Sequence, residues 1–293
     1  MVDAACAAPG SQPTGDDVSV VVPTRDRPDL LRRALASVRA QTVRPAAVIV
    51  VEDGGVTAAT RAVVVEAGAD GRVPVQLLAS SGGAAQARNL GLAQVTTRFT
   101  AFLDDDDHWR PTFVERTLEV VQGRSAPTAV FTAAVLVVDD RETEWLPCVR
   151  DAVGLLTDNG GFAGQNGLFP TDAVRAVGGW DERLVAFQDR DLQVRLAVAG
   201  LSFEVWPEPL TVIDKSHHGP RISTTRRAEG SWQFTRTWWS FAPLRRRPAM
   251  LVQLALCQES AGSRWRRAIW RFTWTARRGW RRLRGRRWRA ASR

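Results

Sequence analysis

Between residues 18 and 121, short apolar runs alternate with segments whose apolar residues have helical spacing. Strands that are separated by single helices pair in parallel, and the helices then cover both faces of the sheet. The pattern therefore predicts an α/β fold with a mostly parallel sheet. The expected strands are residues 18–22, 47–51, 73–78 and 98–103, and the expected helices are residues 28–38, 57–67, 84–94 and 111–121.

Polar side chains follow three of these strands where each strand ends. Residues 24–26 follow the first strand, Glu52 and Asp53 follow the second, and four consecutive carboxylates, residues 104–107, follow the fourth. The carboxyl ends of parallel strands meet at one edge of a sheet, where ligands bind. An acidic cluster there can hold a hard cation such as Mg²⁺ or Mn²⁺, or it can be a solvated acidic loop. The three converging polar clusters favour a binding site.

The second half of the chain is less regular. Residues 139–165 are polar and contain glycines, with little periodicity. We expect this segment and residues 224–262 to select a second substrate. The expected strands are residues 129–138, 203–205 and 210–213, and the expected helices are residues 171–177 and 189–199.

The positive charge of the chain is confined to its end. Residues 264–293 contain thirteen arginines and neither an acid nor a lysine, so the formal net charge of +9 becomes −4 for residues 1–263. A mildly acidic body argues against a nucleic-acid-binding protein. Within this tail, apolar residues recur at steps of three and four among the arginines, which predicts a basic helix lying on an anionic membrane surface. The alternatives are a nucleic-acid-binding tail and a tail that packs on the domain.

The sequence also indicates a cellular compartment. It has no apolar stretch of about 18 residues, so we expect no membrane-spanning helix. Residues 1–17 lack the basic-then-apolar order of a secretory signal and predict a loose lead-in. The three cysteines are far apart and form no CxxC pair, which predicts free thiols and no zinc site. We therefore expect a cytoplasmic protein with a peripheral position on the inner membrane face through its tail.

Five short motifs in order give the chain a family resemblance. Together they resemble the family 2 glycosyltransferases of GT-A (Rossmann-like) fold over about residues 18–225. The motifs are Val-Ser-Val-Val-Val-Pro-Thr-Arg-Asp-Arg (18–27), Val-Val-Glu-Asp-Gly-Gly (50–55), Ala-Arg-Asn-Leu-Gly (87–91), Phe-Leu-Asp-Asp-Asp-Asp-His-Trp (102–109) and Gly-Gly-Trp-Asp-Glu-Arg (178–183), which is followed by Gln-Asp-Arg-Asp-Leu (188–192).

The resemblance implies metal-assisted transfer of a sugar from a nucleoside-diphosphate sugar to a hydroxyl acceptor, with inversion at the anomeric carbon. A UDP-sugar is the favoured donor, and the acceptor would be a glycan, a lipid-linked precursor or a natural product. The implied division is a flexible lead (1–17), a catalytic domain (18–225) and a helical, Arg- and Trp-rich extension (226–293). Within the catalytic domain, residues 18–110 would bind the nucleotide sugar and residues 111–225 the acceptor.

By the same resemblance, Pro23, Thr24 and Arg25 would line the pocket for the base and the ribose. Glu52 or Asp53 would accept hydrogen bonds from the nucleoside. The family usually has two acids followed by Gly-Ser at this point, whereas this chain has Glu-Asp-Gly-Gly. This departure leaves open which of the two acids makes the contact.

The acidic cluster matches the Asp-x-Asp motif of the family, with Asp104 and Asp106 in register. Asp106 would ligate Mg²⁺ or Mn²⁺, and another aspartate would hold the ribose. Asp105 and Asp107 are the lesser candidates, of which Asp105 is assigned to the nucleotide-sugar side. Arg88 would face the diphosphate, or it would form a structural ion pair with the acidic loop.

The catalytic base implied by the resemblance is Asp189, which aligns with the aspartate of the family's Glu-Asp motif. Gln188 stands where the family has glutamate. A single displacement with inversion needs a carboxylate that removes the proton from the acceptor hydroxyl. The remaining candidates are Trp180, Asp181 and Gln188 on the acceptor side, and His218 or its neighbour His217 as a further metal ligand; Asp181 could equally be a helix cap, and the histidines a surface pair.

Two other functions fit the same core less well. A nucleotidyltransferase would show a Gly-rich phosphate loop with a basic residue after the first strand, but residues 23–28 read Pro-Thr-Arg-Asp-Arg-Pro. A nucleotide-sugar-binding protein without transfer activity would have no need of the base. The presence of Asp189 and of a full acidic cluster argues against it.

Overall fold

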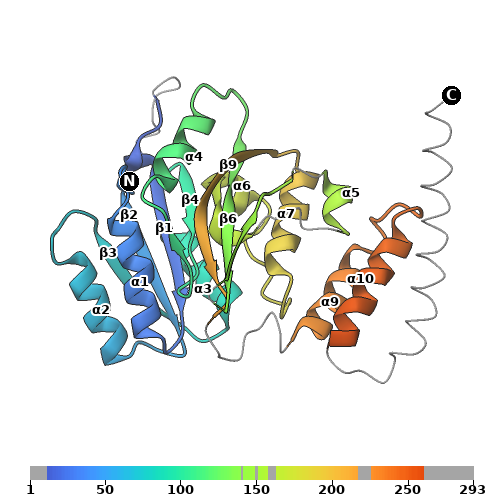
Figure 1. Ribbon diagram of the computed structural model, residues 1–293, viewed down its shortest axis with the longest axis horizontal. Coiled ribbons are helices and arrows are strands. Elements are labelled where there is room, and N and C mark those ends of the chain that lie inside the picture. Colours follow the sequence, from blue (N-terminus) through green and yellow to red (C-terminus); the bar gives the residue numbers. More distant parts are fainter. Residues whose placement is uncertain (1–11, 140, 149–150, 158–162, 217–225, 261–293) are drawn as a thin grey trace, which may run out of the picture.

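The computed structural model describes residues 12–139, 141–148, 151–157, 163–216 and 226–260. Its described part contains one nine-stranded sheet flanked by helices (Figure 1). The strands are β1 (Val18–Thr24), β2 (Ala47–Asp53), β3 (Val75–Ser80), β4 (Phe99–Phe102), β5 (His108–Trp109), β6 (Thr128–Val138), β7 (Arg141–Trp145), β8 (Gly167–Pro170) and β9 (Ser202–Asp214). The helices are α1 (Pro28–Arg39), α2 (Ala58–Gly68), α3 (Ala84–Gln94), α4 (Phe113–Val121), α5 (Ala152–Leu155), α6 (Thr171–Ala176), α7 (Gln188–Val198), α9 (Arg227–Trp238) and α10 (Arg247–Ser260).

The first half of the sheet is parallel and contains the strands expected from the sequence. Its order is β3-β2-β1-β4, so the chain leaves β3 and crosses to the far side of β1 to form β4. The strand order therefore reverses at β1. In open α/β sheets, ligands bind in the crevice at the carboxyl ends of the strands on either side of such a reversal. This topology places the end of β1 and the acidic cluster after β4 side by side.

The second half of the sheet is mixed. Strand β4 pairs antiparallel with β8, β8 pairs antiparallel with β6, and β6 pairs parallel with β9. The two short strands expected at residues 203–205 and 210–213 form the single long strand β9, whose register with β6 shifts beside Pro209. The region of residues 139–165 is not wholly irregular, because β7 forms a hairpin with β6 and α5 follows it.

The sheet has a separate hydrophobic core on each face. On one face, Val20 and Val22 of β1 pack with the apolar residues of α1, α2 and α4. On the other face, Val21 packs with α3, α6, α7 and α9. Because β1 is buried on both faces, three consecutive valines, Val20 to Val22, stand where a half-exposed strand would alternate apolar and polar residues.

Helix α3 approaches the sheet unusually closely at Gly91. A Cβ atom on Gly91 would lie 2.4 Å from Cγ1 of Val21 and 3.3 Å from Cγ2 of Val51. Only glycine permits this approach, although glycine costs about 0.5–1 kcal/mol relative to alanine inside a helix. The close approach packs α3 directly against β1 and β2.

The two ends of the chain were predicted as a loose lead and a basic membrane-binding tail. Residues 1–11 and 261–293 lie outside the described residues, so the membrane-binding tail at 264–293 stays a prediction. The boundary expected near residue 225 also falls among residues that are not described. Among the described helices, none combines the length and the apolar character needed to cross a bilayer.

Candidate active site

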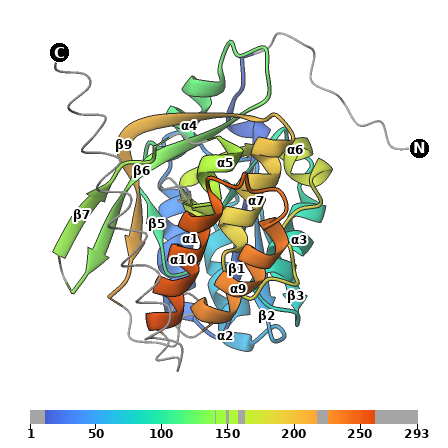
Figure 2. The same cartoon turned by 90° about the vertical axis from the view of Figure 1, so that its right-hand side faces the viewer.

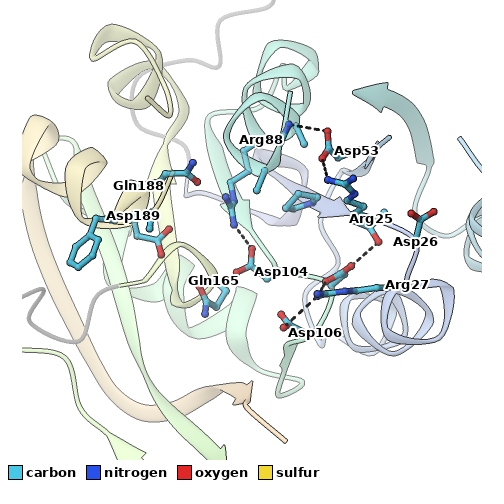
Figure 3. Close-up of a pocket in the computed structure, with 18 of the residues that line it drawn as sticks. Arg25, Asp26, Arg27, Asp53, Arg88, Asp104, Asp106, Gln165, Gln188 and Asp189 are labelled. Carbon is cyan, nitrogen blue, oxygen red and sulfur yellow. Dashed lines mark hydrogen bonds and ion pairs between the residues drawn. The ribbon is translucent and has the colours of Figure 1, made fainter. Parts of the chain in front are cut away.

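A cavity of about 600 Å³ opens at the carboxyl ends of β1 and β4 (Figure 3). One wall comes from the loop after β1, the start of α3 and the acidic cluster. The opposite wall comes from the start of α7 and from Lys215, which follows β9. The lining residues are Pro23, Thr24, Arg25, Asp26, Arg27, Asp53, Gly83, Ala84, Ala87, Arg88, Asp104, Asp105, Asp106, Gln165, Ala186, Phe187, Gln188, Asp189 and Lys215.

Asp53 lies at one end of this cavity, at the end of β2. One carboxylate oxygen accepts a hydrogen bond from the backbone N–H of Gly83 at 2.9 Å, and the other lies 3.4 Å from Nη1 of Arg25. The side chain of Arg25 is 70% exposed. Asp53 is therefore held in place by the start of α3, while Arg25 presents a cation to the entrance of the cavity.

Glu52 points away from the cavity and is fully buried. Its carboxylate accepts hydrogen bonds from the backbone N–H of Thr57 at 2.7 Å and from the hydroxyls of Thr57 and Thr60 at 3.2 and 2.7 Å. Glu52 thereby fixes the first turn of α2. Of the two acids left open by the sequence, Asp53 is the one that lines the cavity.

Asp105 ties the acidic cluster to the end of β1. Its carboxylate accepts a hydrogen bond from the hydroxyl of Thr24 at 2.8 Å and lies 3.3 Å from Nη1 of Arg27. Burial raises the pKa of Asp105 to about 6, although Thr24 and Arg27 act in the opposite direction. The same guanidinium lies 3.7 Å from Asp106. Arg27 is a site residue that the sequence motifs did not single out.

The other three aspartates of the cluster form a candidate metal site. Oxygens of Asp104, Asp106 and Asp107 all lie within 4.8 Å of one another. Burial raises the pKa of Asp107 well above its usual range, and the neighbouring charges of Asp106 and Asp104 raise it further. Three hard oxygen ligands with mutual repulsion fit Mg²⁺ or Mn²⁺. Asp107, which the sequence ranked below Asp104 and Asp106, belongs to this group.

Arg88 lies between the acidic cluster and Asp189 (Figure 3). Its side chain is 10% exposed, and Nη2 donates a hydrogen bond to Asp104 at 2.6 Å. The guanidinium also stacks over the ring of Trp180, 4.5 Å from the ring centroid. Both sequence-based interpretations of Arg88 are therefore compatible with its position, since it forms the ion pair and lines the cavity.

Asp189 is the second residue of α7 and faces the cavity across from the acidic cluster (Figure 3). Burial raises its pKa to about 6, and the charge of Asp104 contributes to the increase. Arg88, Lys215 and the backbone N–H of Gly164 oppose the increase. A carboxylate whose pKa lies near neutrality can hold or release a proton under physiological conditions, which suits a general base.

The remaining predicted residues have different positions. Gln188 lines the cavity, and its Nε2 donates to the carbonyl of Leu184 at 2.6 Å. Trp180 is 1% exposed and packs behind Arg88, outside the cavity lining, while Asp181 is paired with Arg183 at 2.8 Å. His217 and His218 lie outside the described residues.

Lys215 and Phe187 are cavity residues that no motif identified. The one available signal for Lys215 was that it is the only lysine in a chain that otherwise uses arginine. Phe187 has a left-handed backbone, with φ of 65°. A bulky residue rarely adopts the left-handed backbone conformation by itself. The sequence therefore could not indicate that Phe187 does so, because its neighbours impose the conformation.

Comparisons with known proteins identify the family of this chain and agree with its fold. The model of the Glycosyl transferase family 2 matches residues 19–170. The pre-mycofactocin glycosyltransferase of Mycobacterium tuberculosis is 32% identical over 237 residues, which cover 74% of this chain and 47% of that protein. The putative teichuronic acid biosynthesis glycosyltransferase TuaG of Bacillus subtilis is 34% identical over 124 residues, covering 42% of this chain and 48% of that protein. The chain thus spans about half the length of these curated relatives.

Solved structures of other proteins share the fold of this chain at lower sequence identity. The mannosyltransferase PcManGT from Pyrobaculum calidifontis, in complex with GDP-Man and Mn²⁺, aligns with a TM-score of 0.60 and 19% identity over 84% of this chain and 73% of that chain. S. aureus TarS 1–349, in complex with UDP-GlcNAc, aligns with a TM-score of 0.60 and 16% identity over 83% of this chain and 81% of that chain. These similarities confirm the predicted GT-A fold. Together with the match over residues 19–170, they show that this chain belongs to glycosyl transferase family 2.

Proposed function

We propose that this chain transfers a sugar from a nucleoside-diphosphate sugar to a hydroxyl acceptor, with inversion at the anomeric carbon. The observation that carries the proposal is the position of Asp189 across one cavity from the aspartates Asp104 and Asp106, with Arg88 between them. A donor held against the aspartates would direct its anomeric carbon toward Asp189. The family membership of the chain supports the same chemistry.

On the donor side, we assign Pro23, Thr24, Arg25 and Asp53 to the nucleoside, since they line one end of the cavity. Arg88 then lies where a diphosphate would extend toward the second wall. A UDP-sugar is our favoured donor. A relative in fold was solved with UDP-GlcNAc and another with GDP-Man, which supports a nucleotide-sugar donor and leaves both nucleotides to be tested.

For the metal, we propose that Asp104, Asp106 and Asp107 hold Mg²⁺ or Mn²⁺. The fit rests on their converging oxygens and on the raised pKa of Asp107, because a cation would relieve the repulsion. A bound divalent cation would neutralise the negative charge that develops on the departing diphosphate. Arg88, already paired with Asp104, adds a fixed positive charge on the same side.

In the proposed reaction, Asp189 removes the proton from the acceptor hydroxyl while the hydroxyl oxygen attacks the anomeric carbon. The bond between that carbon and the phosphate oxygen breaks, and the nucleoside diphosphate leaves with the bonding electron pair. Attack from the face opposite the leaving group inverts the anomeric configuration. Asp189 must be ionised to act, and its position beside Arg88 and Lys215 favours the ionised form near neutral pH.

The stereochemistry of the reaction tests the proposal directly. A screen of UDP- and GDP-sugars with Mn²⁺ would identify a donor, and water can replace the unknown acceptor in a slow hydrolysis. Proton NMR of the freshly released sugar should show the anomeric configuration opposite to that of the donor. A product that retains the donor configuration would contradict the proposed single displacement.

The rate of sugar transfer should also decrease as the pH is lowered. Because Asp189 acts in its ionised form and burial raises its pKa to about 6, the rate should fall about tenfold for each pH unit below pH 6. Above about pH 7 the contribution of this group should be constant. The measurement is kcat between pH 5 and pH 8, with donor affinity determined over the same range because the pKa of Asp105 is also about 6. A flat kcat between pH 5 and pH 7 would argue against Asp189 as the base.

We further propose that the acceptor belongs to a cell-envelope glycan, a lipid-linked precursor or a natural product. The names of two relatives, which refer to teichuronic acid and succinoglycan biosynthesis, support the first class. The membrane-binding role of residues 264–293 and the peripheral position at the inner membrane face remain part of this proposal.

A further inference from the structure

The carboxylate of Asp189 depends on a short segment with a strained backbone. Residues 185–191 comprise the three residues before α7 and its first turn, and the residue just before the helix, Phe187, has φ of 65°. A non-glycine residue in a sparsely populated backbone region costs about 1–3 kcal/mol and persists only where neighbouring groups hold it. Asp189 follows two residues later, so whatever holds Phe187 also sets the direction of Asp189.

Helix α9 packs directly on this segment through Gly230. A Cβ atom on Gly230 would lie 2.5 Å from Cβ of Ala186 and 2.9 Å from its backbone N and Cα. The helix backbone therefore touches the backbone of the segment, with no room for a side chain between them. Glycine inside a helix is otherwise unfavourable by about 0.5–1 kcal/mol, so the close contact has an energetic cost in α9.

Two polar contacts fix the segment on either side of Asp189. On the N-terminal side, the backbone N–H of Val185 donates to Oε1 of Gln233 at 3.0 Å. On the C-terminal side, Nε1 of Trp238 donates to Oδ1 of Asp191 at 2.9 Å. The carboxylate of Asp191 is 1% exposed, and its other oxygen accepts from Nε of Arg195 at 2.8 Å. Oδ1 of Asp191 thus joins α7 to α9, and its contact with Arg195 fixes the carboxylate within α7.

Phe234 of α9 fills the space between these contacts. The centroid of its ring lies 5.8 Å from the ring centroid of Phe187. The guanidinium carbon of Arg190 lies 5.0 Å from the same centroid of Phe234. Phe234 is 2% exposed. Residues of α9 therefore contact the segment immediately before and immediately after Asp189, while leaving Asp189 itself open to the cavity.

We propose that α9 is a positioning element for the catalytic carboxylate: Gly230, Phe234 and Trp238 hold residues 185–191 so that Asp189 faces the donor. The inference rests on the proposed role of Asp189 as the base. Helix α9 lies next to α7 (Figure 2) and on the opposite side of the described structure from β1 to β3 (Figure 1). It also lies outside the residues that match the family. The C-terminal extension would therefore be part of the catalytic machinery of this chain, acting without touching the donor or the acceptor.

The test compares two tryptophans of the same helix in the full-length chain. Trp238→Phe removes the hydrogen bond to Asp191 and keeps an aromatic ring, whereas Trp232→Phe changes a side chain that is 56% exposed. Gly230→Ala is a second variant that pushes α9 away from Ala186. The measurements are kcat and its pH profile, the Kd of UDP with Mn²⁺, and amide hydrogen exchange of the peptide that covers residues 185–191.

We expect Trp238→Phe and Gly230→Ala to lower kcat about tenfold or more, since misplacement by about 1 Å can cost up to about 10²-fold. The Kd of UDP should stay the same, and residues 185–191 should exchange faster. The charged groups that face Asp189, namely Arg88, Asp104 and Lys215, are unchanged in these variants. A displaced α9 would let water reach Asp189, and this hydration would lower the pKa of its carboxyl group. The decrease of kcat on acidification should therefore occur at lower pH in these two variants. Trp232→Phe should match the wild type.

The proposal is overturned if Trp238→Phe and Gly230→Ala exchange faster at residues 185–191 but keep the wild-type kcat and acid limb. Helix α9 would then only shield the hydrophobic core from solvent and have no role in positioning Asp189. It is also overturned if neither variant changes the exchange of this segment. Failure of the proposed base would appear separately, as an Asp189→Asn variant that transfers sugar at the wild-type rate.

Discussion

Replacing Asp189 with asparagine should slow sugar transfer by about 10²–10⁴-fold and leave the Kd of the donor unchanged. Asparagine has nearly the same shape, so it can keep the contact with the backbone N–H of Gly164, but it cannot accept the proton of the acceptor hydroxyl. The donor-binding groups lie on the opposite wall of the cavity. Kd and kcat should therefore separate in this variant, and calorimetry with UDP and Mn²⁺ beside a donor-hydrolysis assay would measure both.

A matched control for this variant is Asp172→Asn on α6. The side chain of Asp172 is fully exposed, so the same chemical change there should leave kcat at its wild-type value. The pH profile adds a second criterion, because the acid limb near pH 6 should disappear from the residual activity of Asp189→Asn. If this variant retained the wild-type rate with an unchanged acid limb, another group would have to be the base.

Replacing Asp106 with asparagine should abolish the dependence of donor binding on Mn²⁺. Asp106 is one of the three aspartates whose oxygens converge, and its side chain is 18% exposed, so it can reach an ion from the cavity side. Loss of one carboxylate ligand should weaken UDP binding in Mn²⁺ by at least about tenfold. Sugar transfer should fall by about 10²–10³-fold, because the charge on the leaving diphosphate is no longer balanced.

Chelation of the metal separates this effect from the contact between Asp106 and Arg27. Treatment with EDTA should weaken UDP binding to the wild type and have no further effect on Asp106→Asn. Asp29→Asn, at a side chain that is 93% exposed in the first turn of α1, is the control. If Asp106→Asn bound UDP with the same Mn²⁺ dependence as the wild type, the cation would have to be held elsewhere.

The parallel half of the fold could be predicted from the sequence because its elements are determined locally. Strand β1 is buried on both faces and contains the consecutive valines Val20 to Val22, and Pro28 begins α1 at its first turn. The position of Asp53 and Asp104 at one edge of the sheet was predictable, since the carboxyl ends of parallel strands converge whatever their side chains are. The position of Asp189 opposite them was not, since it comes from the start of α7. The choice between Glu52 and Asp53 was not predictable, because it depends on which acid turns inward to Thr57 and Thr60.

The second half could not be predicted in the same detail because its elements depend on distant partners. Strand β5 has two residues, and the four residues of β8 begin with Gly167 and end with Pro170, so neither strand shows an apolar period. Strand β7 is an exposed, charged hairpin arm that exists only because β6 offers it hydrogen bonds. The contacts between α9 and residues 185–191 likewise join segments about 45 residues apart, such as Val185 and Gln233.

The close approach of α3 to the sheet has a consequence for how this sequence can change over time. Gly91 and Arg88 are three residues apart on α3 and share a helix face, so a displacement of the helix at one position moves the other. A methyl group at position 91 would press on Val21 and shift the guanidinium of Arg88 relative to Asp104. Substitution of Gly91, which does not line the cavity, is therefore restricted because it would displace a residue of the site. Selection for catalysis thus acts on more positions than those that line the cavity.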